Sequence, residues 1–279
     1  MSTANAPLSI GKVTLTVHDL EGVTRFYEKT VGLAVLETDA NRATLGAGGT
    51  VLLELRRDPH ARRRLPNEAG LFHTAFLLPS RGDLARWLVH AAAAKVALQG
   101  AADHLVSEAV YLADPEGNGI EIYIDRPREV WTRTGDLVAM SSDPLDIESL
   151  MASTEGRDWR GFPDGSVVGH VHLQVGTIAP AEEFYTRLGF NITCRYPGAT
   201  FYGSGGYHHH LATNIWNSRN APVRSGPATG LADVEIVAGD AEIFDAARLR
   251  LAAAGSPAPR ALKVVDPWGT ELTIRPLAR

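Results

Sequence analysis

Apolar and polar residues alternate from Lys12 to Val17, which is the period of a strand with one buried face. Asp19 then stands where a helix N-cap is expected, and apolar residues follow at helical spacing up to Val31, just before Gly32. Three short strands are expected next, near residues 33–38, 42–46 and 50–56. The pattern predicts one strand, one helix and three strands in that order, a βαβββ unit.

The same plan returns in the second half of the chain. Residues 168–175 alternate like a strand, and residues 181–189 have helical spacing with Phe184-Tyr185 at the place of Phe26-Tyr27. Glycine-rich turns occupy matching places in the two units: residues 46–49 and 203–206. Self-similarity of this kind indicates duplicated structural units.

Two further units carry a different signature. Strand-like segments at 72–78 and 233–237 are each followed by a helix-like segment, at 83–94 and 241–254. Each of these units ends in a strand that follows an Asp-Pro-x-Gly turn, at 114–117 and 266–269. We therefore predict an α+β fold of four βαβββ units: residues 8–58, 70–125, 166–216 and 229–276.

The segment 126–165 matches none of the units. It contains Pro127, Pro144 and Pro163 among several glycines and serines, so we interpret it as a connection with one short helix. The connection separates a first half, residues 8–125, from a second half, residues 166–277.

Composition narrows the class of protein. The 279 residues, 44% of them hydrophobic, can bury a core large enough for two domains. The net charge is −5 and no basic run is interleaved with aromatic residues, which argues against a nucleic-acid partner. No apolar run approaches the roughly 20 residues that span a bilayer. A single cysteine, Cys194, and the lack of a signal-like N-terminus favour the cytoplasm, and a homo-oligomer is compatible with all of this.

The landmarks of the four units occur together in a known superfamily. Phe-Tyr and Leu-Gly pairs in units one and three, with Asp-Pro-x-Gly turns in units two and four, resemble the vicinal-oxygen-chelate superfamily of glyoxalases, bleomycin-resistance proteins and extradiol dioxygenases. Within it, the sequence segments 117–127 and 207–216 are most similar to those of two-domain catechol 2,3-dioxygenase-like proteins. The resemblance implies that the units pair into two cupped, barrel-like sheets with helices outside, each cup able to surround one metal.

The resemblance also implies where the metal ligands lie. The first-strand ligand position, seven residues before the helix start, is occupied in the four units by Lys12, His73, His170 and Asp233. The last-strand position, seven residues after the Asp of Asp-Pro-x-Gly, is Glu121 in unit two and Thr273 in unit four. Two imidazoles and one carboxylate, here His73, Glu121 and His170, are the ligand set of mononuclear iron(II) oxygenases.

Two pairings of the units are open. Units two and three together assemble His73, Glu121 and His170, and we prefer this arrangement because Lys12 would oppose a dication in a cup of units one and two. Units three and four would instead offer a fallback ligand set: His170, His210, Asp233 and Glu271.

The resemblance implies that the strand with the histidine run 208–210 supplies an acid/base group near the metal. Strand alternation would place His208 and His210 on one face and His209 on the other. We favour His210, followed by His208, as the histidine that moves protons near the metal. The resemblance further implies that Tyr111 orients the substrate, whereas His104 has no motif context and is expected at the surface.

The leading functional hypothesis is an iron(II) extradiol dioxygenase that opens a small aromatic diol of the catechol type with O2. Manganese, zinc and nickel are the alternative metals. A glyoxalase-like isomerase or lyase is the second hypothesis, and a fourth protein ligand from His210 would favour it. The third is a non-catalytic binder of small molecules, which would hold no metal.

Overall fold

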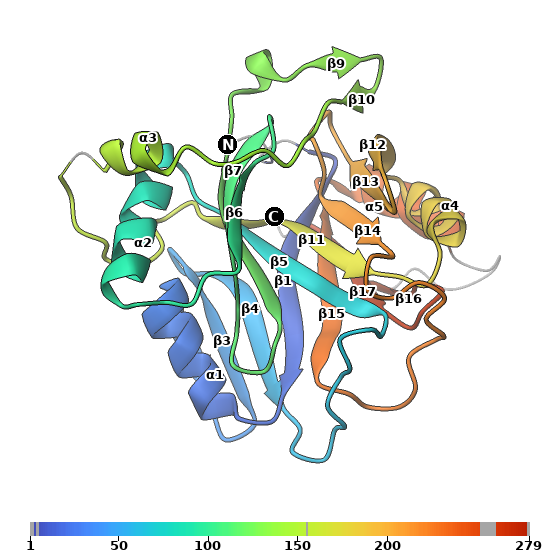
Figure 1. The fold of residues 1–279 in the computed structure, drawn as a ribbon. Coiled ribbons are helices and arrows are strands. Elements are labelled where there is room, and N and C mark those ends of the chain that lie inside the picture. Colours follow the sequence, from blue (N-terminus) through green and yellow to red (C-terminus); the bar gives the residue numbers. More distant parts are fainter. Residues whose placement is uncertain (1–2, 4–5, 155, 252–260, 278–279) are drawn as a thin grey trace.

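The structure is a computed structural model that describes residues 3, 6–154, 156–251 and 261–277. It confirms the α+β prediction, because two curved sheets occupy the centre and the helices lie outside them (Figure 1). Strands of the first and fourth repeats form the seven-stranded sheet, in the order β16 (Leu262–Val265), β17 (Glu271–Pro276), β15 (Gly230–Ala238), β1 (Leu8–Val17), β4 (Thr50–Arg57), β3 (Arg42–Ala47) and β2 (Ala34–Thr38).

The second and third repeats form the other sheet. It has eight strands, in the order β12 (Asn191–Tyr196), β13 (Ala199–Gly203), β14 (Leu211–Asn214), β11 (Val167–Gln174), β5 (Gly70–Leu77), β8 (Gly119–Asp125), β7 (Ser107–Ala113) and β6 (Gly100–Asp103). Antiparallel pairing at the centre, β5 with β11 here and β1 with β15 in the other sheet, joins the two halves of the chain.

The helices begin and end where local chemistry supports it. Their bounds are α1 (Leu20–Phe26), α2 (Arg81–Ala93), α3 (Ile147–Ala152), α4 (Ile178–Leu188) and α5 (Ala241–Leu251). The Asp19 carboxylate caps α1 by accepting the Gly22 N–H. The Ser80 hydroxyl caps α2 by accepting the Asp83 N–H, and α2 therefore begins at Arg81, two residues before the predicted start. After α1 a π-helical turn, Tyr27–Val31, ends at Gly32 with φ of 104°. The predicted helix 241–254 extends into residues 252–260, which lie outside the described residues.

The Asp-Pro-x-Gly turns are connected to the Phe-Tyr pairs of the neighbouring units. The Asp114 carboxylate accepts the backbone N–H of Glu116 and Asn118, both at 2.9 Å, and Asp266 does the same in its own turn. The Tyr27 hydroxyl donates to Asp114 at 3.4 Å, and the Tyr185 hydroxyl donates to Asp266 at 3.0 Å. These buried bonds link a helix packed on one sheet to a turn of the other, which explains why the two landmarks occur together in each half.

The connection between the halves has structure of its own. It contains a 3-10 turn (Arg128–Val130), the short hairpin β9 (Arg133–Thr134) and β10 (Leu137–Val138), and α3, which packs against α2. Its backbone is tied to the eight-stranded sheet, because the Asp143 N–H donates to the Asp103 carbonyl at 2.9 Å and the reverse bond has the same length. The connection therefore lies along the rim of that sheet (Figure 1).

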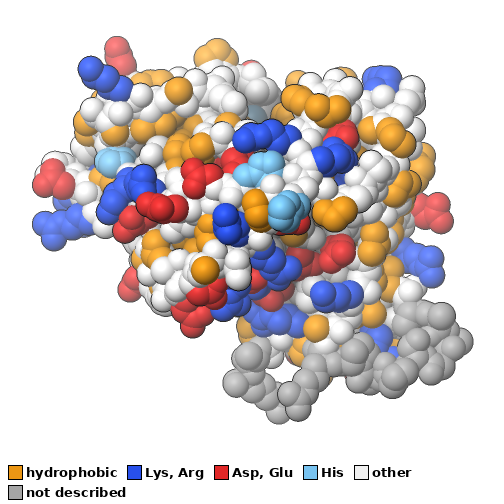
Figure 2. Space-filling view, turned by 90° about the horizontal axis from the view of Figure 1, so that it is seen from below, with side chains coloured by type: hydrophobic (Ala, Val, Ile, Leu, Met, Phe, Trp, Pro, Cys, Tyr) orange, Lys and Arg blue, Asp and Glu red, His pale blue; other side chains and the backbone are white. Residues whose placement is uncertain are grey.

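None of the described helices is long and apolar enough to cross a membrane. On the face shown in Figure 2, cationic and anionic side chains are interspersed, so the described residues form no continuous basic stripe there.

The shared sheets make the two halves dependent on each other. We expect residues 1–127 and 160–279, produced separately, to aggregate or stay unfolded, because each would expose the long unpaired edges of its central strands. Near-UV circular dichroism and size-exclusion chromatography would detect this, and co-production of the two fragments should restore the native signal. A cooperative unfolding transition in either isolated half would contradict the dependence.

Candidate metal centre

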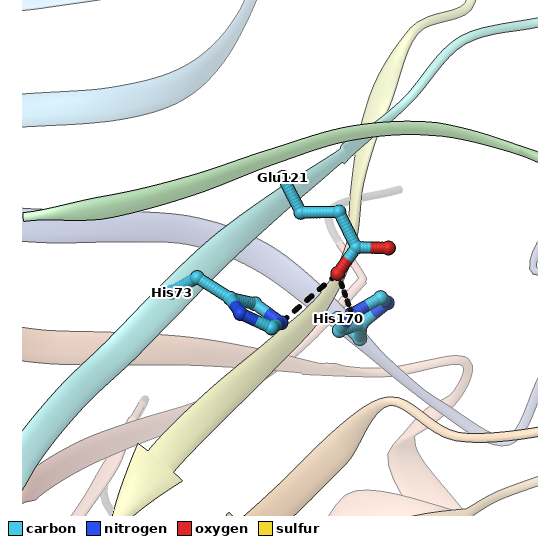
Figure 3. A group of neighbouring side chains, drawn as sticks. All are labelled: His73, Glu121 and His170. Carbon is cyan, nitrogen blue, oxygen red and sulfur yellow. Dashed lines mark hydrogen bonds and ion pairs between the residues drawn. The ribbon is translucent and has the colours of Figure 1, made fainter. Parts of the chain in front are cut away.

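Three buried side chains from central strands converge in the eight-stranded sheet (Figure 3). His73 Nε2 lies 3.0 Å from Glu121 Oε2, and His170 Nε2 lies 3.1 Å from the same oxygen. Strand register brings them together, since Ala75 on β5 pairs with both Glu121 on β8 and His170 on β11. In the described part of the chain this is the only group of three or more such residues whose ligand atoms lie within 4.8 Å of one another.

The spacing of the three residues, and the protonation of His170 and Glu121, fit a divalent metal. Bonds of about 2.1 Å at right angles around an ion separate the donor atoms by about 3.0 Å, as the two nitrogen–oxygen distances do here. His73 Nε2 is buried, and although it lies 3.0 Å from Glu121 Oε2 it forms no hydrogen bond of normal geometry within the described structure. Burial lowers the pKa of His170 to about 4 despite Glu121. Burial alone would raise the pKa of Glu121, but His170 and His73 hold it well below its usual range. A neutral imidazole at His170 and an ionised carboxylate at Glu121 are ligand forms that metals require.

A cavity of about 360 Å³ opens onto the three residues. The side chains around it that bear on function are His104, Tyr111, His172, Phe201, His209 and Trp216. The connection between the halves also contributes, through residues 140–142. The sequence analysis did not anticipate this, because no local pattern shows where a connection lies in space.

Tyr111 lies in the cavity, directly opposite Glu121 in the β7–β8 pairing. Burial and the neighbouring Glu121 raise the pKa of its hydroxyl well above the usual value, so Tyr111 stays a neutral phenol. The surface prediction for His104 is wrong. Its Nε2 lies 2.6 Å from the Tyr111 hydroxyl and its Nδ1 lies 2.6 Å from the Ser141 carbonyl, so both ring nitrogens are engaged.

The histidine run is placed differently from the prediction. His209 lines the cavity, with its ring centroid 4.1 Å from that of His170, whereas His208 and His210 do not line it. His210 is fully buried beside Tyr207, and its Nδ1 accepts the Ser204 N–H at 3.2 Å. Strand alternation does not apply to the run, because β14 begins only at Leu211.

A buried hydrogen-bond chain leads away from His209. Its Nδ1 lies 2.7 Å from His208 Nδ1, and His208 Nε2 lies 2.8 Å from Asp125 Oδ1. Tyr207 donates to the same oxygen at 3.0 Å, and the hydroxyls of Tyr207 and Tyr123 are 2.8 Å apart. Burial and neighbouring histidines lower the pKa of His209 well below its usual value, so its ring is neutral.

The chain of bonds determines the tautomers when both rings are neutral. A carboxylate only accepts hydrogen bonds, so the Nε2 of His208 carries the proton and its Nδ1 is a bare acceptor. His209 must then donate from Nδ1, which leaves its Nε2 lone pair free. The arrangement makes His209 a candidate proton acceptor at the wall of the cavity.

The fallback ligands are not brought together. Asp233 and Glu271 lie on β15 and β17 of the seven-stranded sheet, and Asp233 accepts a hydrogen bond of 2.8 Å from the Thr273 hydroxyl. His210 is held by Ser204, as described above. On β1 and β4 of that sheet Lys12 forms an ion pair with the buried Glu54, so an ammonium group neutralises this carboxylate. The fallback set of His170, His210, Asp233 and Glu271 is therefore wrong.

Comparisons with known proteins agree with the fold and show the family. Residues 9–122 match the model of the Glyoxalase/Bleomycin resistance protein/Dioxygenase superfamily. A catechol-2,3-dioxygenase of Bacillus subtilis (strain 168) is 40% identical over 263 residues, which cover 91% of each chain.

Solved structures share the fold at low sequence identity. The CppA protein of Streptococcus pneumoniae TIGR4 superposes with a TM-score of 0.59 at 12% identity, covering 96% of this chain and 99% of that one. Glyoxalase I from Zea mays superposes with a TM-score of 0.56 at 15% identity, covering 96% and 92%. Given the extent and identity of the match to the Bacillus relative, the chain belongs to the glyoxalase/bleomycin resistance protein/dioxygenase superfamily.

Proposed function

We propose that this protein is an iron(II)-dependent extradiol dioxygenase acting on catechol-type diols with O2. The observation that carries the proposal is a buried set of two histidines and one glutamate that borders a largely aromatic cavity. Its 40% identity to a protein named catechol-2,3-dioxygenase supports the same reaction. In this reaction the ring bond beside one hydroxyl-bearing carbon breaks, and both atoms of O2 enter the product, so no external reductant is consumed.

The number of ligands favours this reaction over glyoxalase-like chemistry. Within the described part of the chain, no fourth histidine, cysteine, aspartate or glutamate joins His73, Glu121 and His170. His210, the residue expected to supply a fourth ligand, is bonded to Ser204 instead. A three-ligand set leaves positions for two substrate oxygens and for O2.

Each part of the cavity has a role in the proposed reaction. Iron(II) bound to His73, Glu121 and His170 would supply Lewis acidity and a template for the diol and O2. His209 Nε2 accepts a proton from a catechol hydroxyl, and Asp125 and His208 keep that nitrogen unprotonated beforehand. The Tyr111 hydroxyl donates to His104 Nε2, because His104 Nδ1 donates to the Ser141 carbonyl, so the Tyr111 oxygen accepts a hydrogen bond from a hydroxyl of the bound diol and orients it.

Metal content tests the ligand assignment. We expect His73→Ala, Glu121→Ala and His170→Ala each to lower the iron bound per protein by at least about tenfold, because removing one of three ligands weakens the site and admits water. His210→Asn is the matched control, since it removes a buried imidazole outside the group and keeps an acceptor for the Ser204 N–H. Elemental analysis after anaerobic loading measures the result. Full stoichiometry in all three variants would refute the site, and iron loss in the control would revive a ligand role for His210.

Oxygen uptake with catechol tests the proton acceptor. We expect His209→Phe to keep its iron and to lose about 10²–10⁴-fold in kcat, the usual contribution of a general base. His210→Asn should stay within a few-fold of the parent enzyme. A lower kcat in His210→Asn together with normal turnover in His209→Phe would show that His210, as predicted from the sequence, is the proton acceptor.

The hydrogen-bond chain behind His209 can be tested separately. His208→Leu removes both of its bonds and should lower kcat about 10–100-fold, with KM and iron content little changed, as is usual for residues that orient a reacting group. Tyr123→Phe is the control, because it leaves the contacts of Asp125 with His208 and Tyr207 intact. Equal kcat values for His208→Leu and the parent would remove the chain from the mechanism.

A further inference from the structure

The cavity beside the candidate metal ligands carries no cationic group suited to an anion. Its described lining includes no lysine or arginine, and Glu121 is its only acidic residue. Both ring nitrogens of His104 are occupied by Tyr111 and Ser141, so this side chain does not offer a free donor either. Arg126 is paired with Asp103 and Glu108 and does not line the cavity.

One wall of the cavity is aromatic and starts next to the metal ligands. The Phe72 ring centroid lies 5.3 Å from that of His73, 5.0 Å from that of His172 and 5.5 Å from that of Trp216. Phe201 continues the wall at 5.7 Å from His172. The indole N–H of Trp216 donates to the Pro197 carbonyl at 2.9 Å, which holds this 46% exposed ring in place at the cavity. Rings in these edge-on and tilted arrangements favour a flat apolar occupant.

Other parts of the lining are polar but uncharged. They include Gln99, Ser107, Ser141 and Ser142. These groups can form hydrogen bonds with a hydroxyl or an ester, but they cannot offset the cost of removing a carboxylate from water, which is several kcal/mol without a cationic partner.

The cavity is larger than one ring requires. A cavity of about 150 Å³ is sufficient for benzene. The 360 Å³ available here therefore leaves room for a second group of ring size beside the diol.

We propose that the substrate is an uncharged catechol with an apolar, ring-sized substituent packed against Phe72, Phe201 and Trp216, and that catechols with an acidic substituent are rejected. This inference rests on the proposed dioxygenase function and specifies which diols the cavity accepts.

Matched pairs of diols separate charge from size. With iron-loaded enzyme, kcat/KM for 3,4-dihydroxybenzoate should be about 100-fold or more below that for its methyl ester, because the ester has nearly the same shape and no charge. The kcat/KM for 3-phenylcatechol should match or exceed that for 3-methylcatechol, since the aromatic wall can accommodate its second ring. Comparable kcat/KM for the acid and the ester, or no cleavage of 3-phenylcatechol while 3-methylcatechol is opened, would overturn the inference.

Binding measured without O2 keeps this inference distinct from the proposed function. Quenching of tryptophan fluorescence in the iron-loaded protein should show the ester binding at least about 100-fold more tightly than the acid. Equal affinity would overturn the inference whether or not any diol is cleaved. If no diol is cleaved but the affinity difference is present, the dioxygenase proposal fails and the ligand class inferred for the cavity stands.

Two sets of variants test the walls directly. Gln99→Arg places a cation at the exposed edge of the cavity and should raise the ratio of kcat/KM for the acid to that for the ester about 2–5-fold. The uncharged Gln99→Met should leave this ratio unchanged. Trp216→Ala should reduce the preference for the phenyl over the methyl substituent about 2–10-fold, and Trp216→Phe should largely retain it. An unchanged acid-to-ester ratio in Gln99→Arg, or an unchanged phenyl preference in Trp216→Ala, would count against the proposed wall contacts.

Discussion

The antiparallel pairing of β5 with β11 is the constraint on which the rest of the site depends. It sets His172 opposite His73 and His170 opposite Ala75, while the parallel pairing of β5 with β8 sets Glu121 at the same level. Because side chains alternate along a strand, a slip of one residue would turn His170 to the other face of the sheet. Packing of the flanking Val168, Val171 and Leu173 into the core opposes such a slip, so hydrophobic burial holds the three polar side chains in register.

The seven-stranded sheet has the same strand pairing but lacks, among its described residues, the set of two histidines and one glutamate. β1 and β15 pair as β5 and β11 do, and the corresponding side chains are Lys12, Glu54, Asp233 and Thr273. Here the Lys12 ammonium neutralises the Glu54 carboxylate, and the Thr273 hydroxyl satisfies Asp233. A buried carboxylate needs a cation or hydrogen-bond donors, and the two sheets meet this need in different ways. The two sheets thus share their strand arrangement, whereas among the described residues the convergent candidate metal ligands lie in the eight-stranded sheet.

The proposed chemistry draws on segments that are far apart in the chain. The candidate ligands come from β5, β8 and β11, Tyr111 comes from β7, and His209 comes from the turn before β14. The connection adds Met140, Ser141 and Ser142 to the cavity. The Tyr27–Asp114 and Tyr185–Asp266 bonds tie each half across the two sheets, so the strands that carry the site are held by contacts from both sheets. Function in this protein is therefore a property of both halves together.

The sequence by itself indicated four repeats through local periodicity and recurring motifs, and the elements of the first three follow the predicted order. In the described part of the fourth repeat, two strands rather than three follow the helix. The resemblance to the superfamily then pointed to His73, Glu121 and His170 as candidate ligands. The sequence did not determine which histidine of the run faces the cavity. That depended on where β14 begins, and the bonds of His210 to Ser204 and of His208 to Asp125 leave His209 at the cavity. The contacts of half-buried His104 with Tyr111 and Ser141, and the contribution of the connection to the cavity, were equally beyond sequence patterns, since both depend on how separate segments fold against each other. Periodicity reports which face of an element is buried, whereas only the tertiary structure decides what that face meets.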